Sequence, residues 1–425
     1  MARPLAQFLH VEAAGGVLLA AAAAAAMVWA NSPWRAGYEA LWSTPVDISV
    51  GSFHLAEDLH SVVNDGLMAI FFFVVGLEIK REWTVGELRD RRQAVLPAMA
   101  ALGGMVVPAL IYLAVNAAGG PEGRGWGIPM ATDIAFAVGV MALLGRRVPP
   151  PLKVFLLTLA IVDDLGAIVV IAVVYSDHLA PGFLLVAAAV VAAVGVLRRL
   201  HVTYPPIFVA AGVGLWLCLH ESGVHATIAG VAMGLLTPAV ALQPDLRTQA
   251  VVDALENRDE LTVEEVRATA AAIKGSVSIA ERVGELLHPW SSYVIVPLFA
   301  LANAGIVLQR DALTGATSVF VGVGLGLIVG KCVGVTGFAW LTIRLGVAQL
   351  PRDVVWGQFV GVAVLAGIGF TVSLFITELA FTDDDLVAAA KLGILVASIL
   401  AAVIGALVLV SAGRRRVVVA DDADT

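Results

Sequence analysis

The chain has 425 residues, of which 59% are hydrophobic and 14% charged, and a net charge of −8. Soluble domains contain about 45–50% apolar and about 25% charged residues, so this composition excludes an ordinary soluble fold and indicates a membrane protein. The negative charge argues against nucleic-acid binding, which requires a basic surface. Cys218 and Cys332 lie in apolar runs and give neither a disulfide framework nor a metal-binding spacing.

Apolar runs long enough to cross a bilayer recur along the whole chain. A spanning helix needs about 20 apolar residues. The run at 12–30 is interpreted as a retained span rather than a signal peptide, because many similar runs follow it. We predict an all-α polytopic protein with about twelve spans, although eleven to thirteen fit because two runs are short. The predicted spans are 12–30, 59–79, 95–116, 126–144, 152–175, 182–198, 205–219, 223–240, 290–308, 317–343, 354–380 and 386–411.

A short β-hairpin is predicted between the first two spans. The run Val46–Val50 alternates apolar and polar residues, Gly51 and Ser52 follow as a turn, and Phe53–Leu55 resumes the alternation. A lone hairpin is only marginally stable in water. We therefore expect the segment 45–56 to pair with a second copy of the chain in a homodimer, the alternative being an ordinary loop.

Lysine and arginine are distributed unevenly between the loops, which predicts the orientation of the chain. With twelve spans and a cytoplasmic N-terminus, the outer loops hold only Arg35, Arg124 and Arg310. Both termini are then cytoplasmic. We expect an integral membrane domain at 1–411, a charged cytoplasmic insert at 241–285 that acts as a solvated linker, and a cytoplasmic tail at 412–425. The inner side includes Lys80, Arg81, Arg89, Arg91, Arg92, Arg146, Arg147, Lys153, Arg198, Arg199, Arg344, Arg352, Arg414, Arg415 and Arg416.

Two adjacent acids, Asp163 and Asp164, lie in the middle of the predicted span 152–175. A charge at that depth costs about 2.5–3.5 kcal/mol on insertion scales, and the side chains are too far from either end to reach the interface. Both cannot stay ionised without a counter-charge, so a proton or a cation must neutralise one. Their oxygens suit a hard cation such as Na+ or Li+. The pair predicts exchange of protons for a cation, the alternative being a structural pair satisfied by other helices.

Two predicted spans contain residues that interrupt a helix. One has Pro129, Thr132 and Asp133, which predicts a break near 129–136, and the other has Gly367 and Gly369, which predicts a break near 366–373. Non-helical backbone at membrane depth is tolerated only where it is buried in protein or lines a cavity. Paired broken helices are typical of transporters built from inverted repeats.

Three further ionisable residues are candidates for supporting roles. Helix ends at a break carry partial charges, which Asp133 could compensate at the N-termini and Lys331 at the C-termini. Lys331 lies mid-span and needs those carbonyls or an acidic partner, for which Asp163 is the candidate. A purely structural role for both is the alternative. His225 titrates near neutral pH, so it is either a pH-responsive group or a hydrogen-bonded packing histidine.

These residues belong to longer motifs that resemble the NhaA-type Na+/H+ antiporters. The resemblance extends from about residue 10 to 411. Two features depart from the family pattern: the insert at 241–285 is longer than expected, and Glu285 stands where a second histidine is often found. The matching motifs are Asn64–Ala69, Gly76–Glu82, Ala131–Ala137, Ile161–Ala167, Ser222–Thr227, His288–Trp290, Gly330–Lys331 and Gly367–Thr371.

The resemblance implies an inner-membrane antiporter of twelve helices. It would expel Na+ or Li+, admit more protons than cations per cycle, respond to pH, need no cofactor, and form a homodimer joined partly by the hairpin. Carried over position by position, the resemblance implies that Asp163 and Asp164 carry the cation and the protons. It implies that Thr132 and Asp133 form the first helix break and that Lys331 is the partner of Asp163 or of the helix ends. The candidates that it implies for pH response are Glu78, Glu82 and His225.

Other functional classes fit the sequence less well. The nearest alternative is an exchanger or symporter for another cation, such as K+ or Ca2+. An intramembrane aspartyl protease needs its two aspartates on different helices, and a polyprenyl transferase needs an Asp-rich Mg2+ motif in a loop. A channel has no need of alternating protonation. We therefore predict a secondary transporter rather than an enzyme.

Overall fold

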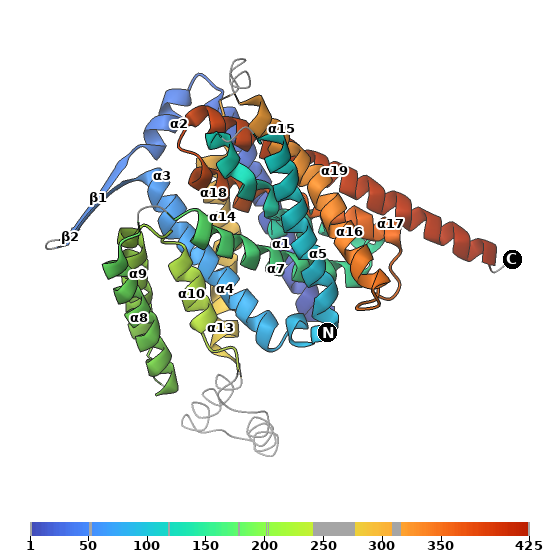
Figure 1. The fold of residues 1–425 in the computed structure, drawn as a ribbon, viewed down its shortest axis with the longest axis horizontal. Coiled ribbons are helices and arrows are strands. Elements are labelled where there is room, and N and C mark those ends of the chain that lie inside the picture. The colour runs from blue at the N-terminus through green and yellow to red at the C-terminus, as the bar shows by residue number, and fades with distance from the viewer. Residues whose placement is uncertain are drawn as a thin grey trace, which may run out of the picture.

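The computed structural model describes residues 2–50, 53–117, 120–176, 179–200, 202, 204–240, 277–307 and 316–423. Within these ranges the chain is a body of packed helices with a single two-stranded sheet at one end (Figure 1). The expected turn at 51–52 and the insert up to residue 276 lie outside the described residues.

The first half of the chain supplies the hairpin and the helices that carry most of the predicted site residues. Four of its elements are wider or tighter than an α-helix: η1 is π-helical, and η2, η3 and η4 are 3-10 helices. The elements are α1 (Ala2–Ala30), α2 (Arg35–Trp42), β1 (Pro45–Val50), β2 (Phe53–Asp58), α3 (Leu59–Ser61), η1 (Val62–Leu67), α4 (Met68–Thr84), η2 (Glu87–Arg89), α5 (Arg91–Val115), η3 (Pro121–Met130), α6 (Ile134–Leu144) and η4 (Gly145–Arg147).

The second half packs around the same core and adds two more π-helical turns, η5 and η6. In Figure 1, α8 and α9 lie side by side at the edge of the body. The elements are α7 (Pro150–Val174), α8 (Pro181–Arg199), α9 (Pro205–Ser222), α10 (Ile228–Leu236), α13 (Ile279–Trp290), η5 (Ser291–Ile295), α14 (Val296–Asn303), α15 (Thr317–Leu325), η6 (Gly326–Gly330), α16 (Lys331–Arg344), α17 (Trp356–Leu365), α18 (Phe370–Ala380) and α19 (Asp384–Ala423).

The length and apolar character of the helices agree with a helical membrane protein. Six helices in the described ranges qualify as spans by length and composition, or up to nine if each of three bent pairs is one span. These nine coincide with nine of the predicted ranges. The other three predicted ranges, 205–219, 223–240 and 290–308, contain α9, α10 and α14. The total of twelve spans stays a prediction.

One predicted span is shorter than expected. The range 223–240 is helical only over Ile228–Leu236, and Gly223, with a left-handed φ of 79°, ends the preceding helix α9. Helix α13 begins at Ile279, within the last residues of the insert predicted at 241–285, and the extent of that insert stays a prediction. Hydropathy does not detect the end of α10, since it measures apolar content and not backbone conformation.

The predicted hairpin is present. Strands β1 and β2 pair antiparallel from Pro45 opposite Asp58 to Val50 opposite Phe53, so the second strand continues two residues beyond the predicted segment 45–56. Asp58 then begins α3 by accepting a hydrogen bond of 2.7 Å from the Ser61 amide. Partial burial of Asp58 favours its neutral form, but the hydrogen bonds from Ser61 outweigh this and lower its pKa.

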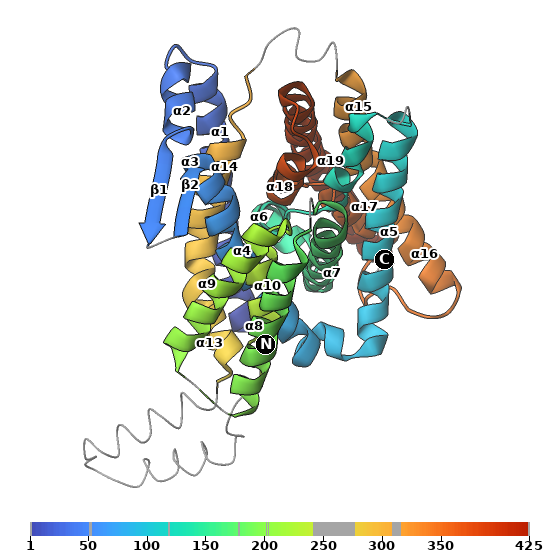
Figure 2. The same ribbon diagram turned by 60° about the vertical axis from the view of Figure 1, so that its left-hand side comes forward.

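Both predicted helix breaks are confirmed. The axes of η3 and α6 differ by 40° across residues 131–133, and those of α17 and α18 differ by 44° across residues 366–369. The Asp133 amide donates a hydrogen bond of 2.6 Å to the Ile368 carbonyl, so the two unwound segments touch. Figure 2 shows α6 and α18 meeting at the centre of the body, near α7.

Glycines bring two pairs of helices into backbone contact around this centre. A Cβ atom on Gly234 of α10 would lie 2.7 Å from the Phe73 carbonyl oxygen and 2.8 Å from Gly76 Cα, both on α4. Likewise, a Cβ atom on Gly334 of α16 would meet the backbone of Gly103 on α5. Small residues at such crossings are the usual means of close helix packing in membranes. The second crossing fixes α16, which begins at Lys331.

Candidate ion-binding site

A buried ion pair joins α16 to the middle of α7. The ammonium nitrogen of Lys331 contacts Oδ2 of Asp163, and both side chains have no exposed surface. This is the partner that the sequence predicted for Lys331. Each charge compensates the other where neither can reach water, so removal of one would leave an uncompensated charge in the protein interior.

Thr132, in the first helix break, connects this ion pair to the second break. Its hydroxyl accepts a hydrogen bond of 3.0 Å from Lys331 and lies 2.7 Å from Asp163 Oδ2 and 2.9 Å from the Ala366 carbonyl oxygen. A hydroxyl has one proton to donate. Thr132 can therefore donate to the carboxylate or to the carbonyl, but not fully to both.

Asp133 caps the helices that follow both breaks. Its Oδ1 accepts from the Phe136 amide of α6 at 2.9 Å. Its Oδ2 accepts from the amide and the hydroxyl of Thr371 on α18, at 3.0 and 2.7 Å. The first amides of a helix have no partner inside the helix and carry a partial positive charge. One carboxylate thus compensates two helix N-termini, as the sequence predicted for Asp133.

Asp164 has different surroundings from Asp163. It is 4% exposed, and no described group hydrogen-bonds to its Oδ1 atom. The second oxygen of Asp163, Oδ1, also lacks a described partner. A buried carboxylate oxygen without a donor is costly and is usually satisfied by a proton, a water or an ion. Each carboxylate of the pair therefore offers one oxygen that an incoming proton or cation could neutralise.

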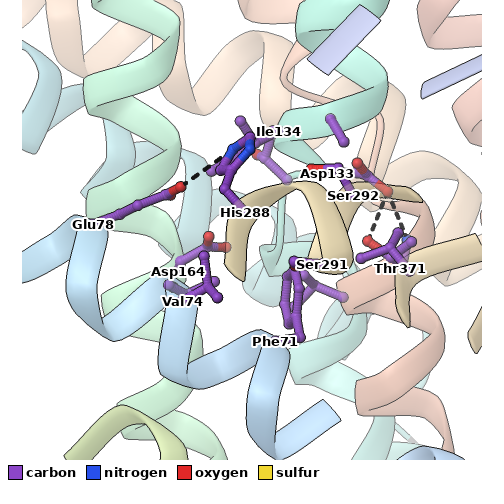
Figure 3. A pocket seen from close by; sticks show the side chains of 15 residues that line it. Phe71, Val74, Glu78, Asp133, Ile134, Asp164, His288, Ser291, Ser292 and Thr371 are labelled. Carbon is purple, nitrogen blue, oxygen red and sulfur yellow. Dashed lines mark hydrogen bonds and ion pairs between the residues drawn. The ribbon is translucent and has the colours of Figure 1, made fainter. Parts of the chain in front are cut away.

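Asp164 borders a cavity of about 60 Å³, which is room for roughly four water molecules. In Figure 3 its carboxylate points into the space between α4, η5 and the first helix break. Thr132, Asp133 and Thr371 also line this space. The cavity therefore joins both interrupted helices to the unpartnered carboxylate. Its full lining is Phe71, Val74, Val75, Glu78, Thr132, Asp133, Ile134, Ala135, Asp164, His288, Ser291, Ser292, Val296, Thr371 and Val372.

Glu78 and His288 lie close together at the edge of the same cavity. Their side chains approach to 3.7 Å between Nε2 and Oε1 and are 28% and 17% exposed (Figure 3). The sequence singled out Glu78, but it noted His288 only as part of a motif. No local sequence pattern could have predicted this contact, because Glu78 lies on α4 and His288 lies near the end of α13, far apart in the chain.

The other two candidates for pH response lie away from the cavity. Oε2 of Glu82 accepts a hydrogen bond of 3.0 Å from the Glu87 amide and so supports the turn after α4. His225 lies between α9 and α10, with its ring 6.2 Å from that of Phe375. The structure brings Glu78 to the cavity, but neither Glu82 nor His225.

Comparison with known proteins gives the family of the chain. The family model described as Na+/H+ antiporter 1 matches residues 6–409. A Na+/H+ antiporter NhaA 3 of Frankia alni is 50% identical over 98% of this chain and 90% of its own length. A Na+/H+ antiporter NhaA of Rhodopirellula baltica is 48% identical over 95% of this chain and 92% of its own length. A Na+/H+ antiporter NhaA 2 of Myxococcus xanthus is 49% identical over 96% of this chain and 88% of its own length. The chain therefore belongs to the Na+/H+ antiporter 1 family.

Proposed function

We propose that this protein exchanges intracellular Na+ or Li+ for external H+ across the bacterial inner membrane. It acts as a secondary transporter and not as an enzyme, and it needs no cofactor. The names of its relatives support this activity. The observation that carries the proposal is the buried Asp164 carboxylate, which borders a cavity and has an oxygen with no described partner.

Exchange follows from competition for the same oxygens. A proton and a small cation each neutralise Asp164, and neither binds well while the other is present. Thr132 and Asp163 supply further oxygens beside it, which suits a hard cation. If Asp164 releases one proton and the Asp163–Lys331 pair releases another as the cation enters, two protons cross for each cation. Transport is then electrogenic.

Control by pH is assigned to the ionisable residues of α4 and their surroundings. The His288 imidazole is 3.7 Å from Glu78, and imidazole titrates in the physiological range. The charge at this edge of the cavity therefore depends on pH. Glu78 is the foremost candidate, and Glu82 and His225 are proposed to act on the packing of α4 and α10.

The proposed molecule has twelve spans built from inverted repeats, with both termini in the cytoplasm. The membrane domain covers residues 1–411, the insert at 241–285 is cytoplasmic, and the tail at 412–425 follows α19. The hairpin at 45–56 joins two copies in a homodimer, because a two-stranded sheet has edges whose backbone groups lack partners.

Everted membrane vesicles from cells that lack other antiporters test this function. Addition of Na+ or Li+ should dissipate an imposed acid interior, whereas K+ and Ca2+ should not. Asp164→Asn should abolish the response, while Asp385→Asn, at an exposed position on α19, should retain it. Normal exchange by Asp164→Asn would contradict the site, and a response to K+ or Ca2+ alone would favour the alternative exchanger.

A further inference from the structure

A π-helical turn forms the wall of the cavity that faces Asp164. In η5, which joins α13 to α14, the Val296 amide bonds to the Ser291 carbonyl five residues earlier. Such a wide turn separates adjacent side chains by less than the ~100° of an α-helix. Ser291 and Ser292 therefore both line the cavity, and they are only 4% and 8% exposed. Isolated π-turns often occur at functional sites.

The hydroxyl of Ser291 differs from most hydroxyls on these helices. Thr84, Thr158 and Ser176 each donate to the carbonyl one turn earlier, at 2.8, 3.0 and 2.8 Å, as is usual inside helices. At Ser291 only the backbone amide donates to the carbonyl one turn earlier, that of Leu287. No hydrogen bond to the Ser291 hydroxyl occurs within the described ranges. A hydroxyl that lines a cavity and has no partner in the protein can bind a ligand or a water there.

The unpartnered groups of this cavity lie on opposite walls. Asp164 supplies an unsatisfied carboxylate oxygen from α7, and Ser291 supplies from η5 a cavity-lining hydroxyl without a described hydrogen bond (Figure 3). The position of η5 is fixed from behind by α1, because a Cβ atom on Gly15 would lie 3.1 Å from Cβ of Ser292. The hydroxyl wall is thus part of a helix that packs closely against α1.

We propose that Ser291 is a ligand of the transported cation and that Ser292 extends the same oxygen-lined wall. This inference rests on the proposed function, since it concerns the cation that Asp164 binds. A hydroxyl oxygen replaces part of the hydration shell of Na+ or Li+ without adding a second negative charge beside Asp164. The cation then gains an oxygen ligand that a competing proton does not use, so this wall favours the metal ion over the proton.

The test measures Na+ binding to the purified full-length protein by calorimetry, independently of transport. Ser291→Ala should weaken Na+ binding by about tenfold to a hundredfold, the size expected for loss of one oxygen contact to a charged group. Ser291→Thr, which keeps the hydroxyl, should recover most of the affinity. Tyr293→Phe is the matched control, because it removes a hydroxyl from the same π-turn that does not line the cavity.

Thermal unfolding separates a ligand from a structural residue. Because the Ser291 hydroxyl has no described hydrogen bond to lose, Ser291→Ala should unfold at the wild-type temperature. Unchanged Na+ affinity in Ser291→Ala would overturn the inference, and so would an equal loss of affinity in Tyr293→Phe. Neither outcome would affect the proposed function, which the vesicle exchange of the wild-type protein tests separately. Failure of the wild-type protein to bind Na+ would overturn both.

Discussion

Two neighbouring carboxylates on α7 have different partners because adjacent helical residues point about 100° apart. Asp163 faces α16 and pairs with Lys331, whereas Asp164 faces the cavity. The first is held by a fixed internal cation. The second borders the cavity and is the carboxylate that we propose to exchange a proton for a cation. Two identical side chains thus have different surroundings because of their positions on one helix.

Replacement of Lys331 by alanine should destabilise the protein. Asp163 would remain buried without its counter-charge, and removal of one partner of a buried pair typically costs about 3–5 kcal/mol. Thermal unfolding in detergent should show a clear drop, and the double variant Lys331→Met with Asp163→Asn should recover much of it. An unchanged unfolding temperature for Lys331→Ala would mean that the pair does not stabilise the fold.

The pH profile of exchange should depend more on His288 than on Glu82. His288→Gln removes the titrating partner of Glu78 at the edge of the cavity, whereas Glu82→Gln alters only a hydrogen bond to the Glu87 amide. Vesicle exchange measured from pH 6 to 9 should shift its half-activation for His288→Gln by about one unit, the effect expected for a contact with one charge. A larger shift of the half-activation pH for Glu82→Gln would assign the pH response to the turn after α4.

The sequence alone was informative where placing a residue type in the membrane interior costs free energy. Asp133 and Lys331 stood out because charges are rare at bilayer depth, and the structure pairs each with the type of group expected. His288 and Ser291 did not stand out. A histidine next to a helix end and a serine in an apolar run are ordinary residues, and their importance depends on which distant helix faces them.

At the scale of elements, the two broken helices depend on Asp133. Asp133→Ala would remove the cap of α6 and that of α18 together, and each lost cap costs about 0.5–2 kcal/mol. Thr371→Val removes only the hydroxyl bond and keeps the amide bond to Asp133. Chemical or thermal unfolding should therefore rank Asp133→Ala well below Thr371→Val. Equal stabilities would show that the backbone contact at the crossing is sufficient without the carboxylate.

Close packing of α4 against α10 gives a second prediction for this scale. Gly234→Ala would place a methyl group 2.7 Å from a carbonyl oxygen of α4, so the helices would have to separate. Overpacking of this kind typically costs about 1–3 kcal/mol. Gly214→Ala on α9 is the control, since no atom lies within 4 Å of the added carbon. The unfolding temperature should fall only for Gly234→Ala; a fall of similar size for both would exclude helix contact as the cause.

Elements with strong local signals were predicted, and those determined by packing were not. The breaks follow from Pro129, Gly367 and Gly369, and the hairpin follows from alternation around Gly51 and Ser52. The three π-turns carry no sequence pattern of their own, because each adds one residue to a helix without a change of composition. The short helix α10 was overestimated for the related reason that apolar loops and apolar helices have the same hydropathy.

At the scale of the whole molecule, the hairpin is the feature that most directly predicts assembly. Deletion of residues 45–58 should convert the proposed dimer into a monomer in detergent, as measured by light scattering, because the edges of the two-stranded sheet would be lost. Asp47→Asn, which keeps the strands, should leave the mass unchanged. A dimer that survives the deletion would assign the contact between copies to the helices.

The class of molecule was predictable from composition, but its complete topology was not. Apolar runs are sufficient to predict a helical membrane protein. Loop charges predict an orientation only if every span is counted correctly, and α9, α10 and α14 are the segments that length and composition leave undecided. Fusion of a reporter that folds only in the cytoplasm to Ala423 should give signal, and silence would reverse the predicted side of the C-terminus.

The capping of two helices by Asp133 also affects how the broken helices can move. One carboxylate accepts hydrogen bonds from α6 and from α18 at 2.7–3.0 Å, so neither half-helix can tilt far while the other stays in place. A motion that displaces one half-helix should therefore carry the other with it. We expect the two broken helices to move as one unit during transport, which would oppose a state in which only one of them opens.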